Sequence, residues 1–150
     1  MAIATEIRSA ATEAHWLLAL GDAQRATGQP ARAQDSYRRA AALQEELGDR
    51  ARRAAAWDGL GQACLQLGRA EEAADCHRRA AETFRDLRLP WETARTLAHL
   101  ALALDHLPAP QEAADVRARV LGLLTEFADR RALRLRDSLV RRSPPGDTPP

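Results

Sequence analysis

Lysine and asparagine do not occur in this chain, and aromatic residues make up only 4% of it. All 22 basic residues are arginine, against 21 acidic residues, and the formal net charge is +1. Residues 129–150 carry six of the arginines and only three aspartates, so residues 1–128 hold 16 arginines against 18 acids. A nucleic-acid-binding domain usually concentrates basic residues on one face of its folded body. Because this body has no such excess, we do not expect nucleic acid to be its main partner.

Long apolar runs are also missing. No stretch approaches the roughly 18 apolar residues that a membrane-spanning helix needs, so we expect no membrane partner. The N-terminal residues lack a basic segment followed by an apolar one, and therefore do not look like a secretion signal. Cys64 and Cys76 are well separated in the sequence and form no Cys-x-x-Cys pair. Such cysteines are typical of reduced thiols, and we expect a cytoplasmic location.

Enzyme motifs are absent as well. The sequence has no Gly-rich phosphate loop, no Gly-x-Ser-x-Gly and no His-Glu-x-x-His. His99 and His106 would share a helical face with Asp105 and could ligate a metal, but scattered surface histidines are the simpler interpretation. Cys76 and His77 are adjacent and would point in different directions on a helix, so we expect His77 to be a packing residue. The sequence predicts no catalysis, no cofactor and no metal.

What the chain does contain is a register that repeats at a fixed step. Gly21, Gly61 and Ala101 follow one another at intervals of 40 residues. Three further columns keep the register: Gly28, Gly68 and Pro108; Ala33, Ala73 and Ala113; Ala40, Ala80 and Val120. Self-similarity with a period of about 40 residues is typical of stacked supersecondary units. The sequence therefore predicts a repeat scaffold, and such scaffolds generally bind rather than catalyse.

Each unit contains two amphipathic helices. In the first helices, apolar and small residues recur at offsets of 0, 3, 4 and 7, which define one helical face: Leu17, Leu20, Gly21 and Gln24; Trp57, Leu60, Gly61 and Cys64; Leu97, Leu100, Ala101 and Leu104. The second helices carry Tyr37, His77 and Arg117 between their small residues. We expect helices over residues 9–27, 30–47, 50–67, 70–87, 91–107 and 110–127. Trp57 should lie between the two helices of the middle unit, among Leu60, Ala73 and His77.

The residues between these segments are typical of helix ends. Gly28 and Gly68 stand where a left-handed residue closes a first helix, and Pro30 and Pro110 stand at the first turn of a second helix. Ser9, Asp49 and Asp129 occupy one column of the repeat, and each is a good N-cap for the helix that follows. Leu89 interrupts this column, but the proline that follows it is itself a helix start signal.

Both ends of the chain can extend the stack. Residues 130–142 occupy the register of a fourth first helix, and Leu133, Leu139 and Val140 should cover the last repeat as a cap. Ile3 and Ile7 match the register of a second helix, so we expect residues 2–8 to pack as a short helical segment. The predicted layout is one domain over residues 1–142, with repeats at 9–48, 49–88 and 89–128, a cap at 129–142 and a disordered Pro-rich tail at 143–150.

Three runs resemble the tetratricopeptide repeat: Leu20-Gly21…Ala33-x-x-x-Tyr37-x-x-Ala40, Trp57-x-x-Leu60-Gly61-x-x-Cys64 and Ala73-x-x-x-His77-x-x-Ala80. That repeat normally has a period of about 34 residues, and the longer step resembles repeats of bacterial signal-transduction regulators and of some eukaryotic polarity adaptors. The third unit departs from the pattern, with Leu97 in place of Trp and Ala101 in place of Gly. The resemblance implies an all-α, right-handed α-α superhelix (a TPR-like solenoid) of about three antiparallel hairpins plus a C-terminal capping helix.

The resemblance also implies a concave groove that holds peptides or helical segments. Residues one step round from the packed column would line it: His15, Leu18, Asp22 and Arg25; Ala55, Asp58, Gln62 and Leu65; Arg95, Ala98, Leu102 and Asp105. Grooves that clamp a C-terminal carboxylate use Lys and Asn, which are absent here. Asp22, Asp58 and Asp105 instead favour an Arg-bearing or mixed-charge segment. The alternative is an ordinary solvent-exposed helix face, where mixed charge is normal.

Two functions follow from these observations. The first is a non-catalytic scaffold or adaptor that binds another protein or peptide in the concave groove and exists as a monomer or weak homodimer. The alternative is a transcription-linked regulatory protein or sensor arm, in which the Arg-rich segment over 130–142 contacts nucleic acid or an acidic partner. Salt-dependent binding to duplex DNA would distinguish the two, because phosphate contacts weaken steeply with salt.

Overall fold

The computed structural model describes residues 1–142, and within them the chain forms seven α-helices and no strand. The expected disorder at 143–150 concerns residues outside this range. None of the described helices is both long enough and apolar enough to cross a membrane. The helices are α1 (Ala2–Ala26), α2 (Pro30–Glu46), α3 (Arg50–Gln66), α4 (Ala70–Asp86), α5 (Pro90–Leu104), α6 (Pro110–Leu124) and α7 (Arg130–Arg141).

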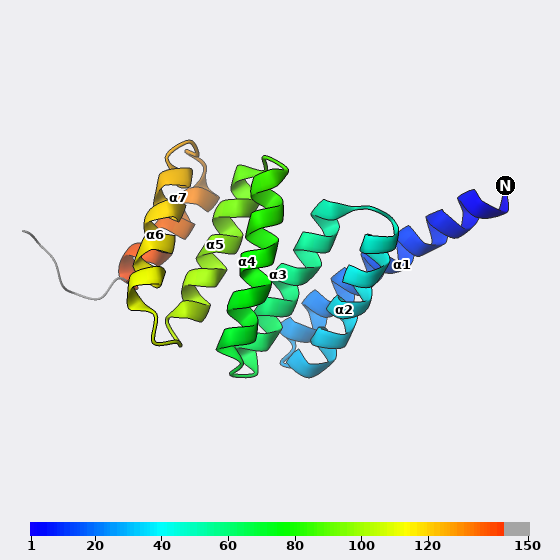
Figure 1. Cartoon of the computed structure of the whole chain (residues 1–150), viewed down its shortest axis with the longest axis horizontal. Helices are drawn as coiled ribbons and strands as arrows, with labels where there is room; N and C mark the ends of the chain where they lie inside the picture. The colour runs from blue at the N-terminus through cyan, green and yellow to red at the C-terminus, as the bar shows by residue number, and fades with distance from the viewer. Residues whose placement is uncertain (143–150) are drawn as a thin grey trace, which may run out of the picture.

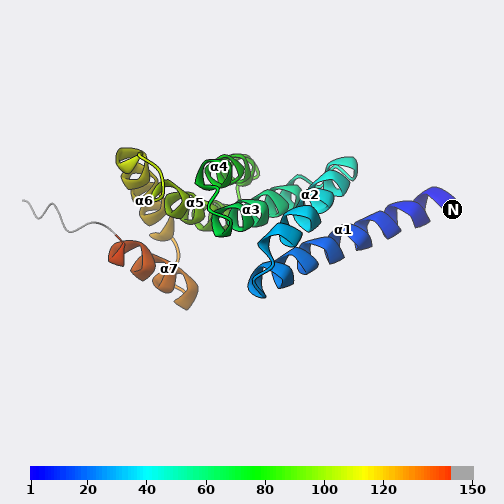
Figure 2. The same ribbon diagram turned by 90° about the horizontal axis from the view of Figure 1, so that it is seen from below.

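The helices stack as antiparallel hairpins in chain order (Figure 1). Each helix packs on the next. In addition, the backbones of the first helices α1, α3, α5 and α7 approach one another, whereas those of α2, α4 and α6 do not. The stack therefore curves with its first helices on the inner side, and α1 and α7 bend toward the same side in Figure 2. An all-α solenoid with a capping helix is confirmed.

Helix ends follow the expected local chemistry at most positions. Gly28 and Gly68 have positive φ angles of 74° and 75°, and Gly48 takes the same conformation at 70°. Asp49 and Asp129 each accept a hydrogen bond from a backbone N–H of the following helix, at 2.9 and 2.8 Å. These side chains satisfy amides that a helix start leaves without partners. The predicted caps at Asp49 and Asp129 are confirmed.

The N-terminal prediction is wrong in two respects. α1 begins at Ala2, so Ser9 lies inside the helix and caps nothing. Ile3 and Ile7 are 72% and 55% exposed instead of packed. The N-terminal residues are exposed because α1 is longer than α2 and continues past its end. Figures 1 and 2 show this extension projecting from the stack with no described helix beside it.

The capping helix is rotated relative to the expectation. α7 lies beside α5 and α6, in the place of a fourth first helix. Ala132 and Leu139 are buried against the stack, whereas Leu133 and Val140 are 47% and 59% exposed. Residues seven apart share a helical face, so burying the pair at 132 and 139 turns their neighbours outward. Leu139 was predicted correctly, and Leu133 and Val140 were not.

Trp57 is only partly buried: it packs against the apolar core from the outer edge of the predicted position. The Arg79 guanidinium lies 4.8 Å from the centre of its ring, and the ring lines a surface cavity with Glu45 and Arg53. Trp57 belongs to the first half of α3, which in an antiparallel stack lies beside the last turns of α2 and α4. Ala73 lies in the first turn of α4, nearer the other end of the hairpin.

Candidate functional site

Two adjacent cavities lie on the inner side of the stack. The first, of about 400 Å³, is lined mainly from α1, α3 and α5, with Tyr37 of α2. The second, of about 290 Å³, continues along the same three helices and adds His77 of α4. Together they contain most of the side chains that the sequence assigned to a groove. We call their lining the inner groove. Of the predicted residues it includes Leu18, Asp22, Arg25, Ala55, Asp58, Gln62, Leu65, Arg95 and Leu102.

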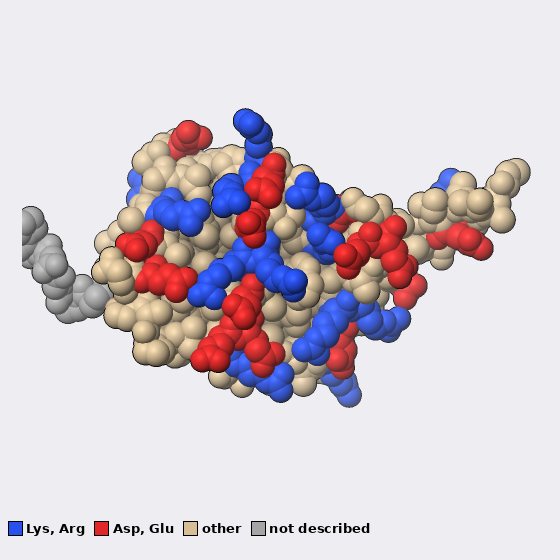
Figure 3. Space-filling view, in the orientation of Figure 1, with Lys and Arg blue, Asp and Glu red and all other residues tan. Residues whose placement is uncertain are grey.

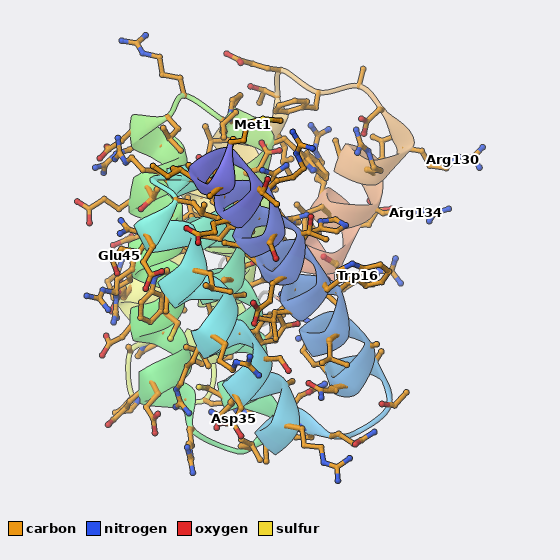
Figure 4. The ribbon with its side chains drawn as sticks, turned by 90° about the vertical axis from the view of Figure 1, so that its right-hand side faces the viewer. Met1, Trp16, Asp35, Glu45, Arg130 and Arg134 are labelled. Carbon is orange, nitrogen blue, oxygen red and sulfur yellow. The ribbon has the colours of Figure 1, made fainter. Side chains whose placement is uncertain are left out.

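Three predicted residues lie outside the inner groove. His15 is exposed next to Trp16, and Figure 4 shows Trp16 projecting from α1 on the side away from α2. Ala98 is buried. Asp105 ends α5 and forms an ion pair with Arg117 instead.

The three aspartates are occupied by internal contacts. Tyr37 donates its hydroxyl to Asp22 Oδ1 at 2.6 Å, and Arg117 donates to Asp105. Asp58 contacts two histidines. Tyr37, His77 and Arg117 are equivalent positions of successive repeats. In each hairpin, the residue at this position of the second helix therefore contacts an aspartate of the first helix. These internal contacts leave the aspartates less available to an Arg-bearing or mixed-charge segment, and the ligand class stays a prediction.

The middle contact is the most buried. His77 Nδ1 lies 2.8 Å from Asp58 Oδ1, and His99 Nδ1 lies 3.0 Å from both carboxylate oxygens. The side chains of His77 and Asp58 are 0% and 4% exposed, and that of His99 is 23% exposed. We call these three residues the Asp58 cluster. They come from α3, α4 and α5, and therefore connect two neighbouring hairpins.

Electrostatics keep the Asp58 carboxylate ionised. Burial alone would raise the pKa of Asp58, but the hydrogen bonds with His77 and His99 outweigh burial and hold that pKa well below its ordinary value. Burial also lowers the pKa of His77, more than the contact with Asp58 raises it. A neutral His77 donates its Nδ1–H to the carboxylate, and its Nε2 is then buried without a hydrogen-bond partner.

This cluster was not predicted from the sequence. His99 was expected at the surface beside His106, but it turns toward Asp58, and His106 is exposed in the turn after α5. A signal was present: His99 follows Asp58 by one repeat step plus one residue. Residues one step apart occupy equivalent places on neighbouring first helices, so Asp58 and His99 had to lie at nearly the same height.

Two arginines remain available in the inner groove. Arg25 and Arg95 both line the first cavity, and within residues 1–142 no carboxylate lies at ion-pair distance from either guanidinium. Arg25 lies beside the Tyr37 hydroxyl, and its Nε is buried without a hydrogen-bond partner. Three half-buried leucines, Leu18, Leu65 and Leu102, add apolar surface. The groove can therefore accept apolar side chains together with negative charge.

The opposite face is different in character. Figure 3 shows the side formed by the second helices, where arginines and acidic residues are interspersed. Several of these charges pair across the stack, as Arg78 does with Glu112 at 2.8 Å and Arg53 with Glu45 at 3.0 Å. Exposed ion pairs of this kind contribute little to stability. The inner groove differs from this face, because its Arg25 and Arg95 have no carboxylate partner among residues 1–142 and lie near half-buried leucines.

The C-terminal helix uses part of its positive charge internally. Arg131 lies 5.0 Å from the centre of the Trp91 ring, and Arg136 donates to the carbonyl oxygen of Leu124 at 3.1 Å. Figure 4 shows Arg130 and Arg134 pointing away from the stack. Nucleic-acid contact by this helix therefore stays a prediction that relies on fewer arginines than the sequence contains.

Known proteins support the same architecture. The chain is similar over 78% of its length, at 18% identity and with a TM-score of 0.74, to the crystal structure of the TPR domain of Arabidopsis FLU, of which the match covers 98%. Comparison with curated proteins found no match. The family model described as tetratricopeptide repeat matches residues 12–86. Repeats of this type generally mediate protein–protein interaction. With half of its residues matched by that model and its fold shared with a solved TPR domain, the chain belongs to the tetratricopeptide repeat family.

Proposed function

We propose that this chain is a non-catalytic interaction scaffold that binds a peptide or helical segment in its inner groove. The observation that supports this most is the arrangement of charge. Asp22 and Asp58 in the groove are satisfied internally, whereas Arg25 and Arg95 are not paired with a carboxylate of the described residues. Opposite charges attract more strongly in a partly desolvated groove than in open solvent. The ligand is therefore a segment that carries acidic residues beside apolar ones.

The groove is suited to this role because it is already formed. Its lining comes mainly from α1, α3 and α5, which are held within the stack by their neighbouring helices. A rigid surface loses little conformational entropy when a ligand binds, so more of the contact energy appears as affinity. The half-buried leucines provide apolar contacts, and Gln62 provides an amide. We infer action in the cytoplasm, as a monomer or weak homodimer.

The test uses a displayed peptide library selected on the purified chain, followed by titration of the selected peptides by fluorescence anisotropy. We expect acidic, leucine-containing peptides to be enriched. The double substitution Arg25→Glu with Arg95→Glu should weaken their binding at least about tenfold, an effect of about 1.4 kcal/mol.

The matched control is Arg38→Glu with Arg85→Glu. These arginines lie on α2 and α4, half exposed and outside both cavities. The control makes the same change in net charge, so it should alter the affinity by less than about half of that free energy. Equal losses in the two double variants would show nonspecific attraction. Enrichment of basic peptides would contradict the proposed charge preference.

A further inference from the structure

The Asp58 cluster has the composition of a metal site. One carboxylate and two imidazoles from three different helices place their ligand atoms within 4.8 Å of one another. His77 is fully buried and Asp58 nearly so, and only His99 reaches solvent, through the inner groove. Side chains held by packed helices are more accurately positioned than side chains on loops. The three donors are therefore brought close together before any ligand arrives.

We propose that Asp58, His77 and His99 bind a divalent transition-metal ion of the Zn²⁺ class through one carboxylate oxygen and two imidazole Nδ1 atoms. Zinc favours tetrahedral sites of nitrogen, oxygen and sulfur donors, and imidazole with carboxylate suits it better than it suits Mg²⁺ or Ca²⁺, which prefer oxygen alone. Three protein ligands leave a fourth position for solvent or a bound group. That position opens into the cavity lined by Leu65 and Leu102.

The observed distances allow this with a small movement. The Nδ1 atoms lie 2.8–3.0 Å from the carboxylate oxygens, which is hydrogen-bond distance. Around an ion with ligand bonds of about 2.0–2.1 Å, tetrahedral donors stand about 3.4 Å apart. The cluster must therefore open by roughly half an ångström, by that same geometry. His99 is the side chain that can move, because it lies at the edge of the cluster and faces the groove.

The contacts of His77 permit coordination through Nδ1. Coordination through Nδ1 requires the ring proton to sit on Nε2. His77 Nε2 is buried and has no hydrogen-bond partner, because it abuts Gly61, where an added Cβ would lie 2.8 Å away. A shift of the proton from Nδ1 to Nε2 therefore sacrifices no existing contact at Nε2. The hydrogen bond lost at Nδ1 is replaced by the bond to the ion.

The charges around the Asp58 cluster determine which group would occupy the fourth coordination position. Asp58 neutralises one of the two charges of the ion, and Arg25 and Arg95 line the adjoining cavity. These arginines oppose a free cation but favour an anion at the fourth position. The site should therefore hold its ion together with an anionic group, either hydroxide from water or a carboxylate.

The test is titration of the full chain, without a polyhistidine tag, with Zn²⁺ by calorimetry and with Co²⁺ by visible absorption. We expect one ion per chain and the intense ligand-field bands of four-coordinate Co²⁺. His99→Gln should weaken Zn²⁺ binding by about 10–100-fold or more, the loss usual when even an outer contact of a metal site is removed. His106→Gln and His15→Gln change exposed histidines away from the cluster and should leave the affinity within twofold.

A second measurement does not depend on any variant. The chain has only four histidines, so their ring nitrogens can be assigned by NMR. Zn²⁺ should shift the Nδ1 resonances of His77 and His99 and move the ring proton of His77 to Nε2. The absence of saturable binding would overturn the proposal. So would binding that His106→Gln or His15→Gln weakens as much as His99→Gln does, or Zn²⁺ shifts confined to His15 and His106.

Discussion

Gly61 lies against His77 so closely that a Cβ on this glycine would stand 2.7 Å from the nearest atom of the imidazole ring. Gly21 has the same relationship with Tyr37, also at 2.7 Å. The two pairs are related by the repeat step of the sequence. A glycine on the first helix therefore makes room for a polar ring on the second, and this contact places His77 beside Asp58.

Gly61→Ala should destabilise the protein. Alanine favours helix by about 1 kcal/mol, but an added methyl in a packed contact costs typically 1–3 kcal/mol, and the ring atoms of a buried histidine cannot move far. We expect a lower urea midpoint. Gly122→Ala is the control, because nothing lies within 4 Å of its added Cβ, and it should be neutral or stabilising. Equal effects of the two substitutions would mean that His77 can yield.

Asp58→Ala and Asp22→Ala should differ sharply. Asp58 is buried and its loss leaves two histidines without their acceptor, which for a buried charged contact costs about 3–5 kcal/mol. Asp22 is exposed and contacts only the Tyr37 hydroxyl, so its loss should cost about 1 kcal/mol. Chemical denaturation measures both. A small effect at Asp58 would show that the cluster does not hold α3, α4 and α5 together.

Acidification should destabilise the metal-free protein in two steps. The pKa of His77 is lowered by burial, so stability is fully present above the unfolded value of about 6.5 and is lost as pH falls below it. The pKa of Asp58 is also lowered, so its contribution is lost below about 4, its value in the unfolded chain. With a chelator present, urea midpoints should stay level from pH 8 to about 7 and then fall as the pH is lowered to 3. A rise between pH 7 and 5 would contradict this.

Arg88→Gly should stabilise the protein. Arg88 has a φ of 56°, where the equivalent helix ends carry Gly28, Gly48 and Gly68. The left-handed conformation costs a non-glycine residue roughly 1–2 kcal/mol, of which part is offset by the greater freedom of glycine in the unfolded chain. We expect the Tm to rise by a few degrees. The reverse change, Gly68→Arg, should lower it, and a fall in both variants would contradict the prediction.

The capping helix offers a matched pair of leucines. Leu139 is buried against the stack, and Leu133 is nearly half exposed on the same helix. Leu139→Ala should cost about 2–5 kcal/mol, whereas Leu133→Ala should change stability by about 0.5 kcal/mol or less. Hydrogen exchange of α7 amides would show whether the cap is released before the rest of the stack. The opposite ranking would mean that α7 packs with its other face.

Local features of the chain were predictable from the sequence because they depend on neighbouring residues. The glycines at 28 and 68, the prolines at 30 and 110 and the aspartates at 49 and 129 act within one turn of themselves. The fixed repeat step then predicted that equivalent units stack. Gly21 and Gly61 were placed correctly on the packed face for this reason.

The tertiary structure decided which side chains meet across helices. Asp58 was predicted to line the groove, and it does so only as a buried acceptor, because His77 and His99 reach it from α4 and α5. A small rotation of a helix changes such contacts without changing its periodic pattern, as α7 shows by burying Leu139 and exposing Leu133. The sequence determined the repeat and its helix ends through short-range chemistry. The relative rotation and height of the packed helices decided which residue each aspartate contacts. They thereby also decided which charged side chains of the inner groove stay unpaired.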